Sequence, residues 1–375
     1  MNRSFLKFQK SPPCVLYCAG QSETNLSALW LREKSQDATA VDHHTQQRLF
    51  DSHLLDPELQ ISAIEVVTDD SIRLSFSDGH LSVYDTRTLL SELRDTDPFP
   101  VAESWNSSLN IQLIRHDWRR MSEDPAFKAS LEAFLRYGFI VLHDVPTLPE
   151  QILEVASKFG YLKETNFGKY FEVYSKPSAN DLAYRSVRLG PHTDNPYRDP
   201  VPGIQLLHCL VNETTGGLST LVDSLSVVER LRLEDPVGHA LLRDTPVRFQ
   251  FIDQGTRLIT RRPMIQTDAD GRTLGVHYSP RLDSLPLLDD ESTRSFHRAR
   301  RRLAELFNNS EFELRFKLEP GELMLFDNSR VLHGRTEYDP AEGHRHLQGC
   351  YIDLDGPRER FSSLELRTRD LKEVA

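Results

Sequence analysis

The sequence predicts a mainly β protein with flanking helices, in which a double-sheet jelly roll follows a small β-rich N-terminal domain. The chain has 375 residues, more than one hydrophobic core usually supports, so two domains are expected. From Leu182 to Tyr351, short apolar-rich segments alternate with turns of Gly, Pro and Asp, and few helix-like stretches interrupt them. Many strands with few helices are typical of a jelly roll.

Residues 1–100 form the predicted small domain, whose clearest feature is a meander of short strands. Apolar and polar residues alternate in the later strand candidates, as they do in strands with one buried face. Turn-forming Asp, Ser and Gly residues separate the candidates, which are 64–68, 72–76 and 81–84. The segment Asp95–Pro100 has two prolines two residues apart, which suit neither a helix interior nor a central strand, so a linker is expected there.

Residues 101–375 form the predicted second domain, which begins with a helix and a buried strand. Asp124 is expected to cap this helix and Gly138 to end it. Its apolar face consists of Phe127, Leu131, Phe134 and Leu135. The other predicted elements are the strand 139–142 and the helices 149–159, 225–233 and 295–306.

Composition and charge exclude several classes of protein. The formal net charge is −11, so the basic face that nucleic-acid binding requires is not expected. No apolar stretch reaches the roughly 18 residues that span a bilayer, and the N-terminus lacks the apolar run of a signal peptide, so we expect a cytoplasmic protein without membrane partners. The four scattered cysteines predict free thiols rather than a disulfide framework: Cys14, Cys18, Cys209 and Cys350.

The most specific local pattern is His192-Thr193-Asp194. Alternate residues of a strand point to the same side, so the His192 and Asp194 side chains can reach one ion together. His333, in the later segment 327–335, supplies a third ligand. Two histidines and one carboxylate leave open coordination positions and suit the oxygen chemistry of Fe(II). A lone His-x-Asp pair occurs by chance, as a hydrogen-bonded turn histidine for example, and the combination with His333 is what predicts an iron site.

Arg345 follows His333 closely and predicts a site for a dicarboxylate co-substrate such as 2-oxoglutarate. One end of that molecule chelates iron through its keto-acid group, and an arginine holds the far carboxylate in bidentate fashion. Ser219 is the candidate hydroxyl beside that carboxylate. Taken alone, Arg345 is better explained by a surface salt bridge, and only its combination with the iron ligands favours the co-substrate role.

Several stretches together resemble the γ-butyrobetaine dioxygenase branch of the 2-oxoglutarate oxygenases and, more distantly, taurine dioxygenase. They span nearly the whole chain and comprise 28–32, 166–168, 192–194, 202–209, 215–217 and 326–335. The resemblance implies a double-stranded β-helix catalytic domain, a homodimer, and hydroxylation with Fe(II), 2-oxoglutarate and O₂, with ascorbate as reductant. It also implies that Leu207 lies beside bound 2-oxoglutarate.

The chain departs from this family at a structural zinc site. Members often hold zinc through three cysteines and a histidine. The cysteine positions here are Ser35, Asp37 and Ala40, which leaves only His80. We therefore expect no zinc in the small domain, which must be held together by packing or through the dimer.

Family substrates carry a trimethylammonium group, which has no N–H to donate and is held by aromatic faces. The resemblance implies a cage of Phe167, Phe171, Tyr184 and Tyr351, although each ring alone would be expected in the hydrophobic core. Asp181 is expected near the cation or outside the pocket, because an aspartate would repel an anionic group.

The anionic end of the substrate has four basic candidates, whose alternative is a solvated charged face: Lys169, Arg185, His277 and Arg281. A dianionic head needs more donor charge than a carboxylate. We therefore take 2-(trimethylammonio)ethylphosphonate as the first substrate hypothesis and γ-butyrobetaine as the close alternative.

Three rival interpretations remain at this point. A non-catalytic cupin-like binding protein is disfavoured by the complete set of predicted metal and co-substrate residues. Halogenation on the same iron is disfavoured because it normally requires the carboxylate ligand to be missing, and Asp194 is present. Action on protein lysine stays open, although a compact aromatic cage prefers a small cation.

Overall fold

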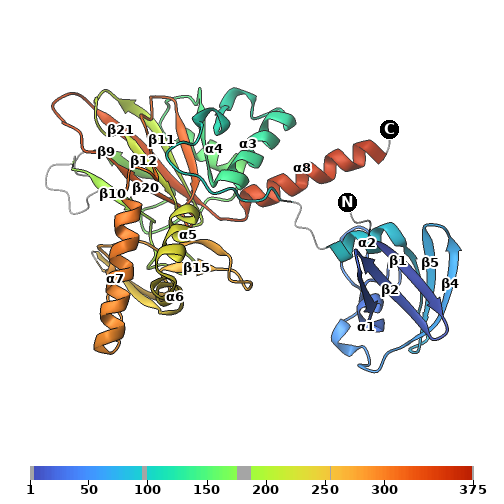
Figure 1. Ribbon diagram of the computed structural model, residues 1–375. Coiled ribbons are helices and arrows are strands. Elements are labelled where there is room, and N and C mark those ends of the chain that lie inside the picture. The colour runs from blue at the N-terminus through green and yellow to red at the C-terminus, as the bar shows by residue number, and fades with distance from the viewer. Residues whose placement is uncertain (1–3, 95–98, 175–186, 254, 374–375) are drawn as a thin grey trace. The chain divides into compact units, whose positions relative to one another are not determined.

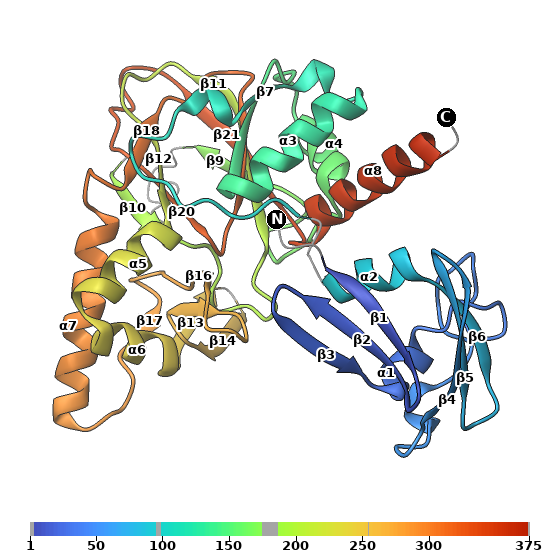
Figure 2. The same ribbon diagram turned by 45° about the vertical axis from the view of Figure 1, so that its right-hand side comes forward.

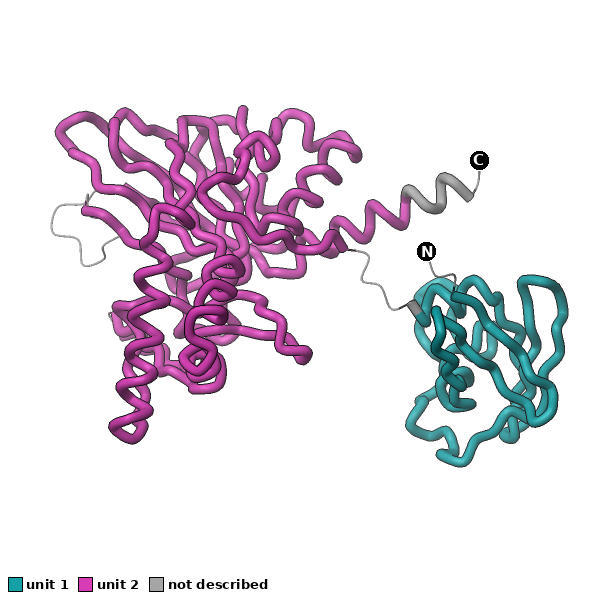
Figure 3. The backbone as a smooth tube through the Cα atoms, viewed as in Figure 1, with its two compact units in different colours: residues 1–97 teal, residues 98–375 magenta. Residues whose placement is uncertain are grey.

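The protein divides into two compact units, residues 1–97 and 98–375, which Figure 3 shows in two colours. The computed structural model describes residues 4–94, 99–174, 187–253 and 255–373. Most of the expected linker therefore lies outside the described residues, as do Asp181, Tyr184 and Arg185.

The small unit is β-rich, as predicted, and its described residues form two three-stranded antiparallel sheets. One sheet is the predicted meander of β4 (Ile61–Thr68), β5 (Ser71–Phe76) and β6 (Leu81–Asp85). The sequence did not reveal the other sheet, which consists of β1 (Phe5–Lys10), β2 (Pro13–Ala19) and β3 (Ser22–Leu26). The helices of the unit are α1 (Ala28–Glu33), η1 (Ser52–Leu54) and α2 (Thr86–Arg94).

A hydrogen-bonded network includes His80, Ser35 and Asp37, three of the positions at which a zinc site was considered from the sequence. His80 Nε2 lies 3.2 Å from Ser35 Oγ and 3.1 Å from Asp37 Oδ2, and Ser35 Oγ lies 3.1 Å from the Tyr84 hydroxyl. Burial alone would raise the pKa of Asp37, but hydrogen bonds, chiefly from Thr39, bring it down to about 2. An ionised carboxylate and polar hydrogen bonds thus link the segment that follows α1 to the meander.

The larger unit contains two facing sheets (Figure 1). Within the described residues, one sheet has six strands in the order β7-β8-β19-β11-β21-β9, and the other has four in the order β10-β20-β12-β18. The first comprises β7 (Arg115–Asp117), β8 (Phe139–His143), β9 (Phe171–Tyr174), β11 (Ile204–Asn212), β19 (Leu323–Asp327) and β21 (Arg345–Ile352). The second comprises β10 (Leu189–His192), β12 (Ser219–Asp223), β18 (Glu313–Phe316) and β20 (Val331–Arg335). This arrangement confirms the predicted jelly roll.

The inner faces of the two sheets share one hydrophobic core. Alternate strand residues point to opposite faces, so Leu207 of β11 points inward and packs with Leu221 and Val331 of the four-stranded sheet. Its neighbours Ile204 and Leu206 belong to a different core on the outer face. Side chains at odd positions of β11 are therefore the ones that can face a site between the sheets.

Helices α3 (Asp124–Tyr137), α4 (Gln151–Phe159) and α8 (Gly356–Glu373) supply the core on that outer face (Figures 1 and 2). The expected cap of α3 was wrong by one residue, since Asp124 is helical and Glu123 precedes it at the cap position. Gly138 ends α3 as predicted, with a positive φ of 78°. A Cβ there would lie 2.9 Å from Arg330 Cδ, so glycine is required for space as well as for conformation.

A third core lies beyond the four-stranded sheet. It is formed by α5 (Ser224–Glu234), α6 (Pro236–Asp244) and α7 (Asp290–Phe307) together with β13 (Val247–Asp253), β14 (Thr256–Arg262), β15 (Ile265–Thr267), β16 (Thr273–Val276) and β17 (Asp283–Ser284). Short 3₁₀ helices η2 (Ile111–Leu113) and η3 (Trp118–Arg120) complete the unit. None of the described helices combines the length and the apolar character needed to cross a bilayer.

Candidate active site

His192, Asp194 and His333 meet at the β10 edge of the four-stranded sheet. β10 and β20 pair antiparallel, and their register places His192 opposite His333. The two imidazole centroids are 4.3 Å apart, and Asp194 Oδ1 lies 3.3 Å from His192 Nε2 and 3.9 Å from His333 Nε2. One ligand atom from each residue lies within 4.8 Å of the others, so the three side chains could hold one metal ion.

The Asp194 carboxylate is carried by a loop rather than by the strand that the sequence suggested, because β10 ends at His192. Asn328 holds the loop backbone: the Asp194 N–H donates to Asn328 Oδ1 at 2.7 Å, and Asn328 Nδ2 donates to the Asp194 carbonyl at 2.9 Å. Asn195 then turns the chain with a φ of 55°, a left-handed conformation that asparagine tolerates better than most residues.

Tyr351 connects this loop to the six-stranded sheet. Its buried hydroxyl donates a 2.7 Å hydrogen bond to Asp194 Oδ2. The other carboxylate oxygen, Oδ1, is the one that faces the two histidines. The hydrogen bond therefore sets the orientation of the carboxylate, as outer contacts of metal ligands commonly do.

The protonation states of these groups suit a divalent cation. Burial alone would raise the pKa of Asp194, but His333, His192 and the Tyr351 hydroxyl hold it well below its usual range. Burial lowers the pKa of His333 to about 3. An ionised carboxylate and a neutral imidazole offer lone pairs without first releasing a proton. Two nitrogens and one carboxylate oxygen on one side fit Fe(II) with open positions for other ligands.

Arg345 and Ser219 both lie inside the jelly roll, where they are 7% and 2% exposed. No described carboxylate forms an ion pair with Arg345, so the surface salt bridge that would explain an isolated arginine is not observed there. Burial and, to a lesser extent, the nearby Arg335 lower the pKa of Arg345 to about 10. A buried guanidinium without an acidic partner is stabilised by an anionic ligand. Gly217 makes room for this side chain, since a Cβ there would lie 3.0 Å from Arg345 Nε.

Arg335 is a second buried cation that the sequence argument did not single out. It follows His333 by two residues on β20, so both side chains point to the same face, and it pairs with Ser219 of β12. The ring of Tyr338 lies 4.9 Å from the Arg335 guanidinium carbon and 5.6 Å from that of Arg345. The spacing of two residues between His333 and Arg335 could have predicted that this arginine faces the site.

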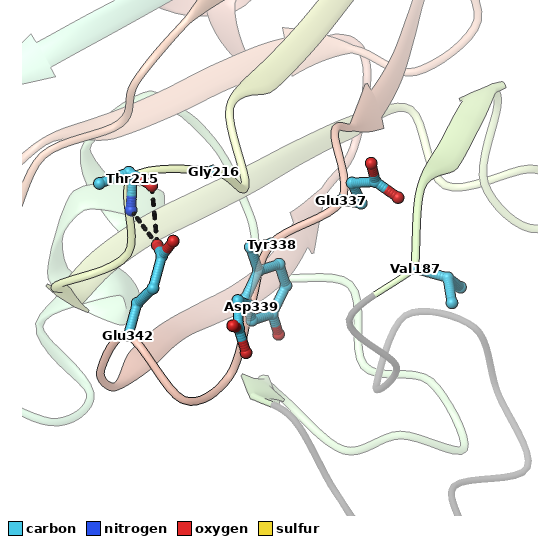
Figure 4. A pocket seen from close by; sticks show the side chains of 7 residues that line it. All are labelled: Val187, Thr215, Gly216, Glu337, Tyr338, Asp339 and Glu342. Atoms are coloured by element: carbon cyan, nitrogen blue, oxygen red, sulfur yellow. Dashed lines mark hydrogen bonds between the residues drawn. The ribbon is translucent and has the colours of Figure 1, made fainter.

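A pocket of about 400 Å³, shown in Figure 4, is lined by Tyr338, whose ring contacts both arginines, and by none of the metal ligands. Its lining consists of Val187, Thr215, Gly216, Glu337, Tyr338, Asp339 and Glu342. The Glu342 carboxylate accepts two 2.8 Å hydrogen bonds from the backbone and hydroxyl of Thr215, which the dashed lines in Figure 4 mark. The Glu342 carboxylate therefore already has hydrogen-bond donors within the protein.

Aromatic rings surround the Asp194 end of the site. Phe171 lies 5.4 Å from Tyr351 and 6.4 Å from Phe167, centroid to centroid, so three of the predicted cage residues are brought together. Phe251 and Tyr197 extend the group, although the sequence did not indicate them: Phe251 lies 6.1 Å from Phe167 and stacks on Tyr197 at 4.8 Å. The three phenylalanines are half-buried, whereas both tyrosines are buried.

Gly349 determines where the Phe171 ring lies. β21 pairs with β9 and β11 so that Gly349 is opposite both Phe171 and Leu207. A Cβ on Gly349 would lie 2.4 Å from Phe171 Cε2 and 3.1 Å from Leu207 Cδ2. Any side chain at this position would displace the ring, so the glycine is needed for close approach.

The charged candidates for the substrate's anionic end fall in different environments. Lys169 and Arg281 are exposed, as a solvated charged face would be. His277 is buried, and its Nδ1 lies 3.0 Å from the Pro263 carbonyl oxygen. Burial lowers the pKa of His277 to about 4, so the ring is neutral at pH 7.

The jelly roll and the His–Asp–His ligand set define a mononuclear non-haem iron oxygenase centre. Comparison with known protein families agrees with this assignment. Residues 99–351 match the family described as "Taurine catabolism dioxygenase TauD, TfdA family", and residues 16–90 match "Gamma-butyrobetaine hydroxylase-like, N-terminal". The chain therefore belongs to the TauD/TfdA dioxygenase family and is an Fe(II)- and 2-oxoglutarate-dependent oxygenase.

Individual relatives extend over most of the chain. Gamma-butyrobetaine dioxygenase of Pseudomonas sp. (strain AK-1) is 34% identical over 344 residues, which cover 90% of each chain. Gamma-butyrobetaine dioxygenase of Homo sapiens is 26% identical and covers 93% of this chain and 94% of its own length. A solved structure of asparagine oxygenase with Fe(II), 3-hydroxyasparagine and succinate superposes with a TM-score of 0.49 at 19% identity, over 61% of this chain and 80% of that one.

Proposed function

We propose that this enzyme hydroxylates γ-butyrobetaine. The observation that carries the proposal is the double role of Tyr351, whose hydroxyl contacts Asp194 while its ring lies in the aromatic group with Phe171. A quaternary ammonium group held on these rings lies next to the metal ligands, so the attached carbon chain passes the reactive position.

This order of substrates reverses the one that the sequence argument favoured. The relative with 34% identity carries the name gamma-butyrobetaine dioxygenase, which supports the carboxylate substrate. Lys169 and Arg281, two of the basic residues invoked for a phosphonate dianion, are exposed. With fewer buried donors among the described residues, a single carboxylate is the better match. The phosphonate analogue is the second candidate.

The residue roles follow from the placement described above. His192, Asp194 and His333 would hold Fe(II), and Arg345 with Ser219 would bind the far carboxylate of 2-oxoglutarate beside Leu207. When bound, Fe(II) and 2-oxoglutarate together with O₂ would supply the oxidising power that inserts one oxygen atom into a C–H bond, while 2-oxoglutarate becomes succinate and CO₂.

The protein's own contribution is positioning and exclusion of water. Tyr351 orients the Asp194 carboxylate, Arg345 fixes the co-substrate, and the rings hold the ammonium group. The reaction requires no side chain to donate or accept a proton. The core side chains around Leu207 keep the interior of the jelly roll apolar, which strengthens the charged contacts made inside it.

The test is succinate formation from 2-oxoglutarate in the presence of Fe(II) and ascorbate. We expect γ-butyrobetaine to stimulate succinate release more strongly than 2-(trimethylammonio)ethylphosphonate, and Asp194→Ala to abolish the stimulation. Asp290→Ala is the matched control, because Asp290 lies at the start of α7 and its side chain is 79% exposed. Equal or greater stimulation by the phosphonate would overturn the proposed substrate.

Assembly as a homodimer and a need for ascorbate are further predictions of the resemblance. Light scattering during size-exclusion chromatography tests the first, since a monomer would elute at the 43.1 kDa of one chain. Omission of ascorbate from the succinate assay tests the second.

A further inference from the structure

The strands β13 and β14 form a hairpin, which is labelled in Figure 2, and this hairpin carries both Phe251 and Arg262. Antiparallel pairing places Leu258 opposite Phe251, and Thr260 and Arg262 follow on the same face of β14 as Leu258. This is the less exposed face of the strand, because the residues between them are exposed. Arg262 therefore lies on the side of the hairpin that carries Phe251.

The contacts of Arg262 leave part of its guanidinium uncommitted. Nη2 donates to the Arg198 carbonyl at 2.6 Å and contacts Thr260 Oγ1 at 3.4 Å. Nε is buried and has no hydrogen-bond partner among the described residues. The carboxylate paired with it, Asp199, is 3.8 Å away and 87% exposed, so water screens that interaction strongly. The side chain of Arg262 itself is only 17% exposed.

Two connections bring this cation to the metal loop. Arg198, whose carbonyl accepts the Arg262 hydrogen bond, lies four residues after Asp194 in a turn closed by a 3.0 Å bond to the Asn195 carbonyl. On the other side, Arg262 is next to Pro263, whose carbonyl contacts the buried His277 ring. The residue after His277 is Tyr278, whose carbonyl accepts the Thr193 N–H at 2.7 Å.

We propose that Arg262 binds the anionic end of the substrate, across Phe251 from the rings that hold the ammonium group. This assignment rests on the proposed function and replaces the exposed candidates Lys169 and Arg281. The contact with Thr260 indicates that the Arg262 guanidinium points back along β14 toward Phe251. Thr260 lies two residues from Leu258, which is opposite Phe251, so the guanidinium lies roughly 7 Å along the strand from that pair. A zwitterion of a few carbons spans such a separation.

The geometry also favours a carboxylate over a dianion. One guanidinium offers two parallel N–H groups, which match the two oxygens of a carboxylate. The neighbouring His277 ring is neutral and adds no second positive charge. The Asp199 carboxylate, 3.8 Å from the Arg262 guanidinium, would oppose a second negative charge.

A purely structural role for Arg262 would be to hold the Arg198 carbonyl and hence the metal loop. The two roles differ in what a substitution disturbs. A structural residue affects metal binding, the melting temperature and every substrate alike. A residue that binds the anion affects only substrates that carry one.

The experiment compares Arg262→Gln and Arg262→Lys with the wild-type enzyme, and Arg281→Gln serves as the control at an exposed arginine. Each is assayed with γ-butyrobetaine and with its alcohol analogue, 4-trimethylammonio-1-butanol, which keeps the cation but lacks the carboxylate. Binding of both compounds to the anaerobic Fe(II)–2-oxoglutarate enzyme is measured by calorimetry alongside KM and kcat.

We expect Arg262→Gln to weaken γ-butyrobetaine binding by about 10- to 100-fold while leaving the alcohol unchanged, and Arg262→Lys to restore part of the loss. Unchanged γ-butyrobetaine binding, or equal weakening for both compounds, would overturn the assignment. Failure of the proposed function looks different, because it is seen in the wild type. An enzyme that neither binds nor turns over γ-butyrobetaine refutes both the function and the assignment.

Discussion

Tyr351 offers the sharpest test of how the site is built, because its ring and its hydroxyl have separate roles. Tyr351→Phe keeps the ring that packs 5.4 Å from Phe171 and removes the hydroxyl that donates to Asp194 Oδ2. A hydrogen bond to a charged group contributes ~1.5–3 kcal/mol, which corresponds to a factor of about 10 to 150 in an equilibrium constant. Loss of an outer contact to a metal ligand typically weakens metal binding by about 10- to 100-fold.

The assay is titration of the metal-free enzyme with Fe(II) under anaerobic conditions, read by competition with a chelator. We expect Tyr351→Phe to bind Fe(II) about 10- to 100-fold more weakly while γ-butyrobetaine still binds the metal-saturated variant normally. Tyr351→Leu should lose both properties, since it also removes the ring. Tyr278→Phe is the matched control, because that buried tyrosine packs against Phe307 in a different core.

Two results would contradict separate roles for the ring and the hydroxyl of Tyr351. If Tyr351→Phe binds Fe(II) as tightly as the wild type does, the hydroxyl does not orient the carboxylate. If Tyr351→Phe weakens γ-butyrobetaine as much as Tyr351→Leu does at saturating metal, the ring and the hydroxyl are not separable.

Three further predictions follow from contacts elsewhere. Gly349→Ala would place a Cβ 2.4 Å from the Phe171 ring and should raise the KM for a trimethylammonium substrate about 2- to 30-fold, with the KM for 2-oxoglutarate unchanged. Arg345→Gln should weaken 2-oxoglutarate binding about 10- to 150-fold by calorimetry, and an unchanged affinity would exclude the arginine from that site. In the small unit, the pKa of Asp37 is about 2, below its unfolded value near 3.9, so its stabilising effect is present above that unfolded value and is lost as the pH falls toward about 2. The difference in urea stability between wild type and Asp37→Asn should therefore shrink from about pH 5 to about pH 3, and a constant difference would contradict the low pKa of Asp37.

The metal ligands could be predicted because their chemistry depends on residue type and short spacing. His192 and Asp194 stand two apart, and few side chains other than histidine and carboxylates bind Fe(II) with open positions. The register of β10 and β20 then places His192 opposite His333, although they are far apart in the sequence. Arg345 was predicted on the same kind of ground, since a planar guanidinium suits a buried carboxylate, and its co-substrate role stays a prediction.

Elements with weak local signals escaped prediction. The β1–β3 sheet contains polar strands such as β3, whose residues are mostly exposed, so the alternation that marks a half-buried strand is faint. The helix α6 begins at Pro236. A proline is common both in turns and at the first position of a helix, so it did not indicate a helix here. These elements owe their conformation to packing against the rest of their unit.

The sequence by itself determined the class of chemistry and named the three residues that lie close enough together to hold one metal ion. The co-substrate role of Arg345 and the substrate role of the rings stay predictions. Only the tertiary structure decided which side chains share an environment. It buried His277 and left Lys169 exposed, and it brought Phe251 and Arg262 from the β13–β14 hairpin to the metal loop. The physical reason is that ligand chemistry depends on residue type and short spacing, whereas burial and the pairing of distant side chains depend on how strands register and pack.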